Sequence, residues 1–214
     1  MTELSHIDAV ILCGGLGTRL RSEIGESQKV AAEVAGQPFL EYNLEYLRQQ
    51  GVKKVVLSVG YKAELLKQYQ GGFRGLEIEF KEDGDKPLGT GGALNNIRAL
   101  ISSNNFLVLN GDSFCFVEYR KLLDFHIGKK AIATIVVTKV NDSSSYGTVK
   151  INNDDRVLRF LEKQTKLQSG IVNAGVYCFE TERYFSQFNS KHSYLEKDIF
   201  PWLVNANALY AFEM

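Results

Sequence analysis

The chain has 214 residues, with 25 Lys and Arg against 25 Asp and Glu, 44% hydrophobic residues and 23% charged residues. This length is sufficient to bury a substantial core, and the composition is typical of globular proteins, which excludes disorder of the whole chain. A net charge of zero argues against a general partner of nucleic acids or membrane surfaces, and no apolar run approaches the roughly 20 residues of a membrane span.

The first 140 residues alternate short apolar runs with segments of helical periodicity. The apolar runs predict strands at residues 8–13, 54–59, 76–81, 105–110 and 131–139. Apolar residues three and four apart predict helices between them, at residues 39–50, 63–69, 89–100 and 118–128. Strands that are apolar throughout and separated by helices indicate a parallel sheet covered on both faces.

The pattern changes from about Tyr146. Three strands separated by short polar turns are predicted at residues 148–151, 157–161 and 171–179, and they indicate an antiparallel extension. No internal repeat, low-complexity tract or Pro-rich linker divides the chain. The prediction is therefore one α/β domain, residues 1–214, with a mostly parallel mixed sheet flanked by helices and a small antiparallel extension in the C-terminal third.

The three cysteines, Cys13, Cys115 and Cys178, lie far apart and among apolar residues. Neither a zinc motif nor a disulfide framework fits this spacing, so we expect buried free thiols and a reducing compartment, most simply the cytoplasm. The N-terminus has no basic segment before an apolar run, and we therefore expect no signal peptide.

A glycine loop follows the first predicted strand. In open α/β sheets ligands bind beyond the carboxyl ends of the strands. Glycines let backbone N–H groups approach a phosphate, and Thr18 and Arg19 add a hydroxyl and a guanidinium, so the loop favours phosphate binding over an ordinary tight turn. It is not a Walker A motif, and Leu20 stands where the dinucleotide fingerprint requires its third glycine.

Two further segments lie where a ligand is expected. Asp112 follows a buried strand and is interpreted equally well as a helix N-cap beside Ser113 or as a ligand of Mg²⁺. Residues 87–93 place three glycines and a threonine at a predicted helix start. That many glycines favour close approach of a nucleobase or an anion over an ordinary helix start.

The histidines, His6, His126 and His192, lie near none of these strand ends, and the sequence shows no Ser-His-Asp, Cys-His or metal-binding histidine pattern. A reaction that needs a general base therefore has no obvious candidate. Nucleotidyl transfer to an anionic phosphate needs none, because positioning, a metal ion and cationic donors suffice.

Several segments, in order along essentially the whole chain, resemble the sugar-1-phosphate nucleotidyltransferases. They are residues 11–20, Lys29, and residues 36–41, 88–93, 109–112, 146–147, 162–163 and 173–175. The resemblance implies a Rossmann-like sheet of the nucleotide-diphospho-sugar transferase type. It also implies that a nucleoside triphosphate and a sugar 1-phosphate react to give a nucleotide sugar and pyrophosphate.

The resemblance assigns a role to each matching residue. Catalysis would rest on Arg19, Lys29 and Asp112, with Asp112 as the Mg²⁺ ligand. The nucleotide would be bound by Leu12, Gly14, Gly15, Gly17, Thr18, Arg19, Gly89, Thr90, Gly91 and Gly92. The sugar 1-phosphate would be bound by Asn110, Tyr146, Gly147, Glu162, Lys163, Asn173 and Gly175, with Lys163 on its phosphate and Glu162 on its hydroxyls.

Within the family, the combination of residues 13–19, 38–40, 60–62 and 87–93 most resembles the guanylyltransferases that act on D-glycero-α-D-manno-heptose 1-phosphate. GTP is then the expected donor, and GDP-heptose for cell-surface polysaccharide is the expected product. Transfer of a uridylyl or thymidylyl group to another hexose 1-phosphate is the alternative. We expect no nucleic-acid or membrane partner and keep a homodimer as an open alternative to a monomer.

Two departures from the family pattern keep other function classes open. Gln28, Val30 and Glu33 stand where the family has prolines around Lys29, and a second metal-binding aspartate expected near the C-terminus has no counterpart before Met214. The domain would then lack its last motif, or Asp112 would hold the metal with substrate oxygens and water. A non-catalytic nucleotide or sugar-phosphate sensor is one alternative. A dinucleotide-dependent oxidoreductase with Glu33 on the ribose is another, against which Leu20 argues.

Overall fold

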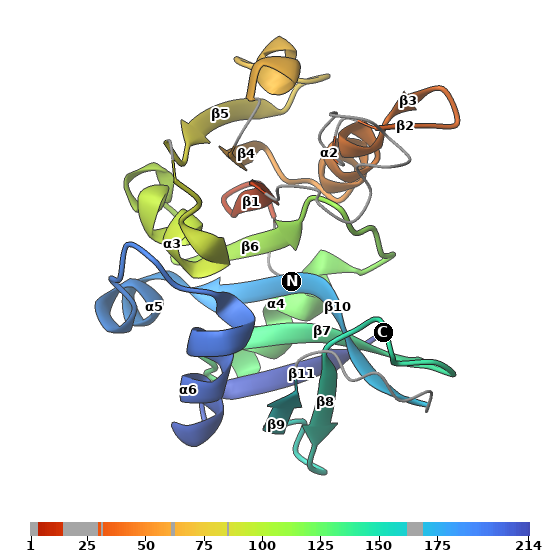
Figure 1. Cartoon of the computed structure of the whole chain (residues 1–214), viewed down its shortest axis with the longest axis vertical. Helices are drawn as coiled ribbons and strands as arrows, with labels where there is room; N and C mark the ends of the chain where they lie inside the picture. Colours follow the sequence, from red (N-terminus) through yellow and green to blue (C-terminus); the bar gives the residue numbers. More distant parts are fainter. Residues whose placement is uncertain (1–3, 15–29, 31, 61–62, 85, 162–168) are drawn as a thin grey trace.

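The computed structural model describes residues 4–14, 30, 32–60, 63–84, 86–161 and 169–214. Within these residues the chain forms a nine-stranded sheet with helices on both faces, and a short hairpin of β2 (Glu33–Val34) and β3 (Gln37–Pro38) (Figure 1). The strands of the sheet are β1 (Asp8–Cys13), β4 (Lys54–Val59), β5 (Glu77–Glu82), β6 (Asn105–Asn110), β7 (Ala133–Val140), β8 (Thr148–Ile151), β9 (Val157–Leu161), β10 (Gly170–Glu180) and β11 (Leu209–Glu213).

The main path of the sheet runs β11-β7-β10-β6-β1-β4-β5, and β8 and β9 lie off it. Strands β5, β4, β1 and β6 are parallel to one another, which confirms the predicted parallel core. Strand β10 is antiparallel to both β6 and β7, and near its start Val172 also pairs with Thr148 of β8. One long strand therefore belongs both to the main sheet and to the predicted antiparallel extension.

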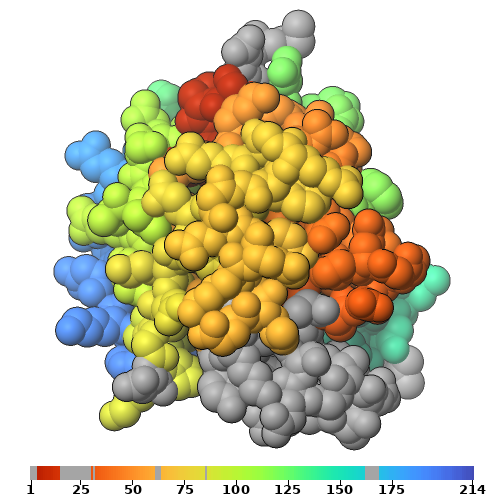
Figure 2. All heavy atoms as spheres, turned by 90° about the horizontal axis from the view of Figure 1, so that it is seen from above, coloured from red at the N-terminus to blue at the C-terminus, as the bar shows by residue number. Residues whose placement is uncertain are grey.

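Side chains alternate between the two faces of each strand, and a separate apolar core forms on each face. Ile11 and Leu57 pack with α2 (Phe39–Gln49), α4 (Tyr119–Gly128) and the 3₁₀-helix η2 (Ala63–Tyr69). The opposite face packs against four helical segments: α3 (Gly89–Asn96), α5 (Thr181–Gln187), η4 (Leu195–Ile199) and α6 (Phe200–Asn205). Figure 2 shows the molecule from above the view of Figure 1. The segment from β4 to β5, in orange and yellow, covers much of the surface seen from that side.

The structure corrects two predicted helices and adds elements after residue 180. Residues 63–69 form a 3₁₀-helix, and the helix expected at residues 89–100 ends at Asn96 and is followed by a 3₁₀ turn, η3 (Arg98–Leu100). No element was predicted for the last part of the chain, which contains α5, η4, α6 and β11. Strand β11 pairs in parallel with β7 and forms one edge of the sheet.

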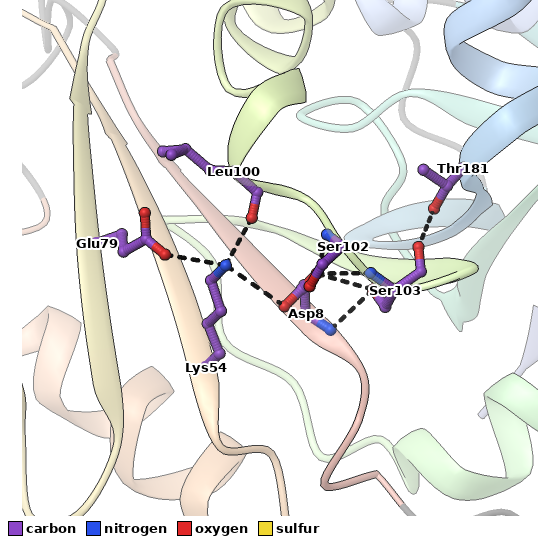
Figure 3. A network of polar contacts seen from close by, with 7 residues as sticks. All are labelled: Asp8, Lys54, Glu79, Leu100, Ser102, Ser103 and Thr181. Atoms are coloured by element: carbon purple, nitrogen blue, oxygen red, sulfur yellow. Dashed lines mark hydrogen bonds and ion pairs between the residues drawn. The ribbon is translucent and has the colours of Figure 1, made fainter.

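A polar network closes the amino edge of the parallel strands (Figure 3). Asp8 starts β1 and is buried, and its Oδ2 accepts hydrogen bonds from the backbone N–H groups of Ser102 and Ser103 at 2.6 and 2.9 Å and from both hydroxyls at 3.1 Å. Lys54, which starts β4, forms an ion pair with Glu79 at 2.9 Å and lies 3.9 Å from Asp8. The polar groups of this edge thus hold one another in place.

The cysteines and histidines lie mostly as expected. All three cysteines are free, with Cys13 and Cys178 buried and Cys115 only partly so. His6 and His192 are exposed, whereas His126 is buried, with its Nδ1 2.8 Å from the hydroxyl of Thr134. Among the described residues, no helix combines the length and the apolar character needed to cross a bilayer.

Candidate active site

Two cavities open at the carboxyl edge of the parallel strands, opposite the network at the amino edge. The smaller has a volume of about 400 Å³ and the larger about 700 Å³. Asn110, Asp112 and Tyr194 line both cavities, which therefore adjoin one another. The antiparallel β10 contributes its first residues to this edge, because Val176 pairs with Leu109 near the end of β6.

The smaller cavity lies over the ends of β1, β5 and β6. Its lining is Leu12, Cys13, Gly14, Val30, Asp83, Pro87, Leu88, Gly89, Thr90, Ala93, Asn110, Asp112 and Tyr194. Most of these residues are apolar or glycine, and the carboxylates of Asp83 and Asp112 are the charged groups among them. Burial raises the pKa of the Cys13 thiol, and the charges of Asp112 and Asp83, which line the same cavity, raise it further.

Asp83 directly follows β5 and is half-buried. Its Oδ1 accepts a hydrogen bond from the hydroxyl of Ser58 at 3.3 Å. A Cβ atom at Gly14 would lie 3.0 Å from its Oδ2, so a glycine here lets β1 pass close to the carboxylate. Burial raises the pKa of Asp83, and hydrogen bonds from Asn96 and Ser58 oppose that rise. A partly desolvated carboxylate of this kind is suited to accept hydrogen bonds from a ligand.

Asp112 is exposed at the junction of the two cavities, just beyond β6. The turn that carries it needs the glycine before it, because a Cβ at Gly111 would lie 2.7 Å from Val30 and 2.8 Å from the carbonyl oxygen of Leu12. The described residues contain no group of three or more His, Cys, Asp or Glu side chains that could hold a metal ion. An exposed carboxylate such as that of Asp112 could supply an oxygen ligand to a divalent ion whose other ligands are waters or substrate oxygens.

The second glycine segment owes its composition partly to packing within the protein. The backbone N–H groups of Gly91 and Gly92 donate to the carbonyl of Ser193 at 2.9 and 3.1 Å. A Cβ at Gly91 would lie 2.5 Å from the Ser193 hydroxyl, and one at Gly92 would lie 2.3 Å from the carbonyl of Lys191. These two glycines are buried against residues 191–193 and do not line the smaller cavity, whereas Gly89 and Thr90, also predicted to bind the nucleotide, do line it.

The larger cavity lies between β6, β8, β10 and η4. Its lining is Asn110, Asp112, Ser113, Phe114, Cys115, Thr138, Val140, Ser145, Tyr146, Gly147, Phe160, Val172, Asn173, Ala174, Gly175, Tyr194, Glu196, Lys197 and Met214. Polar side chains here alternate with aromatic and small ones. Gly147 is required because a Cβ would lie 2.9 Å from the ring of Phe160.

A buried tyrosine orients two of the polar side chains in the larger cavity. The hydroxyl of Tyr177 accepts hydrogen bonds from the amides of Asn173 at 2.9 Å and Asn110 at 3.4 Å. The carbonyl oxygen of the Asn173 side chain accepts from the N–H of Gly175, which has a φ of +79° that favours glycine. Burial and the nearby carboxylate of Glu196 raise the pKa of Tyr177, so its hydroxyl keeps its proton.

The structure brings together the sequence-predicted site residues that it describes, apart from Gly91 and Gly92. Those in the cavities are Leu12, Gly14, Gly89, Thr90, Asn110, Asp112, Tyr146, Gly147, Asn173 and Gly175. The remaining predicted site residues lie outside the described residues: Gly15, Gly17, Thr18, Arg19, Lys29, Glu162 and Lys163.

The cavity residues that were not singled out in the sequence include Asp83, Tyr194, Glu196 and Lys197. Asp83 could have been found, because it follows a predicted strand as Asp112 does. Residues 194–197 belong to a segment for which no element was predicted, and no local pattern places them opposite β6.

The chain matches proteins of one family along most of its length. The family model described as nucleotidyl transferase matches residues 8–214. The D-glycero-alpha-D-manno-heptose 1-phosphate guanylyltransferases of Aneurinibacillus thermoaerophilus and Campylobacter jejuni are similar to it, 38% and 40% identical over 198 and 183 residues. These alignments cover 90% and 85% of this chain and 85% and 79% of the two relatives.

The fold is also found in a solved structure. HddC from Yersinia pseudotuberculosis, solved in complex with GMP-PN, superposes with a TM-score of 0.84 and 32% sequence identity. The superposition covers 97% of this chain and 90% of that chain. The similarity therefore includes the elements that form both cavities.

Proposed function

Because the chain belongs to the nucleotidyl transferase family, we propose that it transfers the guanylyl group of GTP to D-glycero-α-D-manno-heptose 1-phosphate, giving GDP-heptose and pyrophosphate. The observation that carries this proposal is the pair of adjoining cavities with Asp112 at their junction. A transferase for two substrates needs two neighbouring sites, and the reacting phosphates must meet where the sites join.

The smaller cavity is the proposed nucleotide site. Its apolar walls suit a flat base, and Asp83 supplies a carboxylate at one wall. Guanine presents neighbouring N1–H and 2-amino donors, which one carboxylate can accept together, whereas uracil and thymine have a single N–H on that edge. Leu12, Gly14, Gly89 and Thr90 would line the base and ribose, and the triphosphate would extend toward Asp112.

The larger cavity is the proposed site of the sugar 1-phosphate. Asn110 and Asn173, fixed by Tyr177, and the backbone around Gly147 and Gly175 offer hydrogen-bond partners for hydroxyls. Its larger volume suits a seven-carbon sugar. Glu162 and Lys163, predicted to bind hydroxyls and phosphate, belong to this proposal on the strength of the family resemblance.

In the proposed reaction, an anionic oxygen of the sugar 1-phosphate attacks the α-phosphate of GTP in line, forming a new P–O bond while the bond to pyrophosphate breaks. No general base is required, because the attacking oxygen is already ionised. Asp112 would hold Mg²⁺, which when bound stabilises negative charge on the phosphates. Arg19 and Lys29 are proposed to stabilise the leaving pyrophosphate, and the cavity residues keep the two phosphates aligned.

The cellular setting is proposed from the thiols. Three free cysteines, two of them buried, favour a reducing compartment, for which the cytoplasm is the simplest assignment. A homodimer is kept as the predicted alternative to a monomer.

Pyrophosphate release tests the proposal. GTP, ITP, ATP, UTP, CTP and dTTP would each be combined with D-glycero-α-D-manno-heptose 1-phosphate, α-D-mannose 1-phosphate and α-D-glucose 1-phosphate, with and without Mg²⁺. We expect the highest kcat/KM for GTP with the heptose phosphate and no turnover without a divalent ion. ITP, which lacks the 2-amino group, should lose about tenfold or more in kcat/KM in the wild type and much less in Asp83→Asn.

The result separates the remaining alternatives. A highest kcat/KM with UTP or dTTP would replace the guanylyl transfer by the other nucleotidyl transfers. Binding of GTP in calorimetry with no pyrophosphate release from any pair would instead favour a sensor.

A further inference from the structure

Glu196 is an acidic side chain in the wall of the larger cavity to which no role has been assigned. It lies on η4, between Tyr194, which lines both cavities, and Lys197, which lines the larger one. Among the described residues that line this cavity, Asp112 and Glu196 are the two acids. Asp112 stands at the junction with the smaller cavity, so Glu196 provides carboxylate oxygens on a different wall.

The position of the Glu196 carboxylate is fixed from the nucleotide side. The hydroxyl of Thr90 accepts a hydrogen bond from the N–H of Leu195 at 2.8 Å. Its own hydrogen is therefore available for Oε2 of Glu196, which lies 3.3 Å away. Thr90 lies in the first turn of α3 and lines the smaller cavity, so the residue that orients Glu196 belongs to the proposed nucleotide site.

The backbone of η4 also favours a functional role. Residues 195–199 form a single π-helical turn, a rare geometry that occurs frequently at functional sites. Leu195 and Ile199 are buried and anchor both ends of the turn, and the N–H of Tyr194 donates to the carboxylate of Asp198 at 2.7 Å. Glu196 is thus carried by a segment held at both ends.

Other hydrogen-bonding groups converge on the same part of the cavity. Asn173 and Asn110 both donate to the hydroxyl of Tyr177, and the Glu196 carboxylate is near enough to that hydroxyl to raise its pKa. Amide groups that donate or accept and a carboxylate that accepts hydrogen bonds are the combination that surrounds a polyhydroxylated ligand.

We propose that Glu196 is a specificity-determining residue that accepts hydrogen bonds from hydroxyl groups of the sugar 1-phosphate. The proposal rests on the function assigned above to the larger cavity. A carboxylate makes stronger hydrogen bonds to hydroxyls than a neutral acceptor does, and an acceptor in a cavity wall that is left without its hydroxyl penalises a sugar that lacks it. Glu196 thereby selects among sugars that carry the same phosphate.

The test compares the wild type with Glu196→Gln, which keeps the shape of the side chain and removes its charge. Calorimetry would give the Kd of D-glycero-α-D-manno-heptose 1-phosphate, α-D-mannose 1-phosphate and the four mannose 1-phosphates deoxygenated at C2, C3, C4 or C6. We expect Glu196→Gln to weaken binding of the heptose phosphate about 10- to 100-fold and to leave the Kd of GTP unchanged. At least one deoxy sugar should bind the two proteins equally.

Glu182→Gln is the matched control, because Glu182 is exposed on α5 and lines neither cavity. It should bind every sugar phosphate as the wild type does. Binding measurements keep this test separate from the proposed reaction: a wild type that binds the sugar phosphate but forms no nucleotide sugar would contradict the transferase and leave Glu196 testable. Equal Kd values for wild type and Glu196→Gln across the panel, or equal losses for GTP and sugar, would overturn the proposal.

Discussion

The two edges of the parallel strands carry the same kinds of side chain and use them differently. At the amino edge, Asp8 is buried and one of its oxygens accepts four hydrogen bonds, all from Ser102 and Ser103 (Figure 3). At the carboxyl edge, Asp112 is exposed where two cavities meet, and Asp83 lines one of them. A buried carboxylate surrounded by donors of its own chain stabilises the fold, whereas a carboxylate in the wall of a cavity is also accessible to a ligand.

This difference leads to opposite expectations for mutations at the two edges. Removing a group from the amino edge should lower the free energy of unfolding and leave the activity of each folded molecule unchanged. Removing a group from the carboxyl edge should lower activity and leave stability unchanged or raised, because functional sites are commonly built at a cost in stability.

The largest effect is expected for Asp112→Asn. The amide keeps the shape of the side chain and loses the charge proposed to hold Mg²⁺, so kcat/KM should fall about 1000-fold. The midpoint of thermal unfolding should not fall. Pyrophosphate release and a melting curve on the same preparation measure both quantities.

Asp154→Asn is the control, because Asp154 is exposed in the turn between β8 and β9 and lines neither cavity. It should retain full activity. If Asp112→Asn kept near-normal turnover, Asp112 would not be the metal ligand, and the functional contrast between the edges would be lost.

At the opposite edge, Asp8→Ala should destabilise the fold by about 3 to 4 kcal/mol. The substitution leaves the backbone N–H groups and the hydroxyls of Ser102 and Ser103 without their common acceptor, and Ser103 is buried. Urea unfolding measures the loss. The kcat/KM for each folded molecule, determined well below the unfolding transition, should equal that of the wild type. A loss of activity without a loss of stability would reverse the assignment of the edges.

The pH dependence of stability should have opposite signs for His126, which lies away from the cavities, and for Asp83 at the carboxyl edge. His126 lies in α4 beside Thr134 of β7, and burial lowers its pKa from 6.5 to about 4, helped by the charge of Arg183. Between these two values the unfolded chain binds a proton that the folded chain does not, so the stability contributed by neutral His126 is lost as the pH falls. The loss reaches up to about 3 kcal/mol below pH 4.

Asp83 has the opposite effect on the pH dependence of stability, because burial raises its pKa in the folded state. The folded chain then binds the extra proton, and stability falls as the pH rises above the ordinary carboxyl range of about 4. Urea unfolding between pH 3.5 and 7.5 tests both groups. His126→Gln should remove the loss between pH 6.5 and 4, whatever its stability at pH 7, and Asp83→Asn should be more stable than the wild type near neutral pH. If neither variant changed the slope of the free energy of unfolding against pH, the pKa shifts assigned to His126 and Asp83 would be contradicted.

Much of the fold and part of the site follow from local sequence patterns. Apolar runs located β1, β4 and β6 at their observed bounds, and the strand-end rule led directly to Asp112. Long-range packing could not be predicted from these local patterns. Gly91 and Gly92 face the backbone of residues 191–193, a hundred positions later in the chain, and no local pattern distinguishes that partner from a ligand.

The position of β10 between β6 and β7 in the main sheet was not predicted, for the same physical reason. Its sequence indicates a strand of the antiparallel extension, and only the observed pairing with β6 and β7 places it in the main sheet. Glu196 lines the cavity because of another long-range contact, in which η4 packs against the start of α3. Sequence spacing therefore identified the cavity residues near strand ends and missed those that the C-terminal segment contributes.

The smallest effect, and the one that tests the carboxyl edge most closely, is expected for Tyr177→Phe. Its hydroxyl orients Asn173 and Asn110, so its removal should raise KM for the sugar 1-phosphate about tenfold, while kcat and KM for GTP change much less. Tyr184→Phe is the control, because Tyr184 is equally buried on the same face of the sheet and its hydroxyl has no hydrogen-bond partner among the described residues. It should leave every kinetic constant unchanged. Equal changes in both KM values for Tyr177→Phe would mean that the hydroxyl supports the fold generally, and the carboxyl edge would then share the structural character of the amino edge.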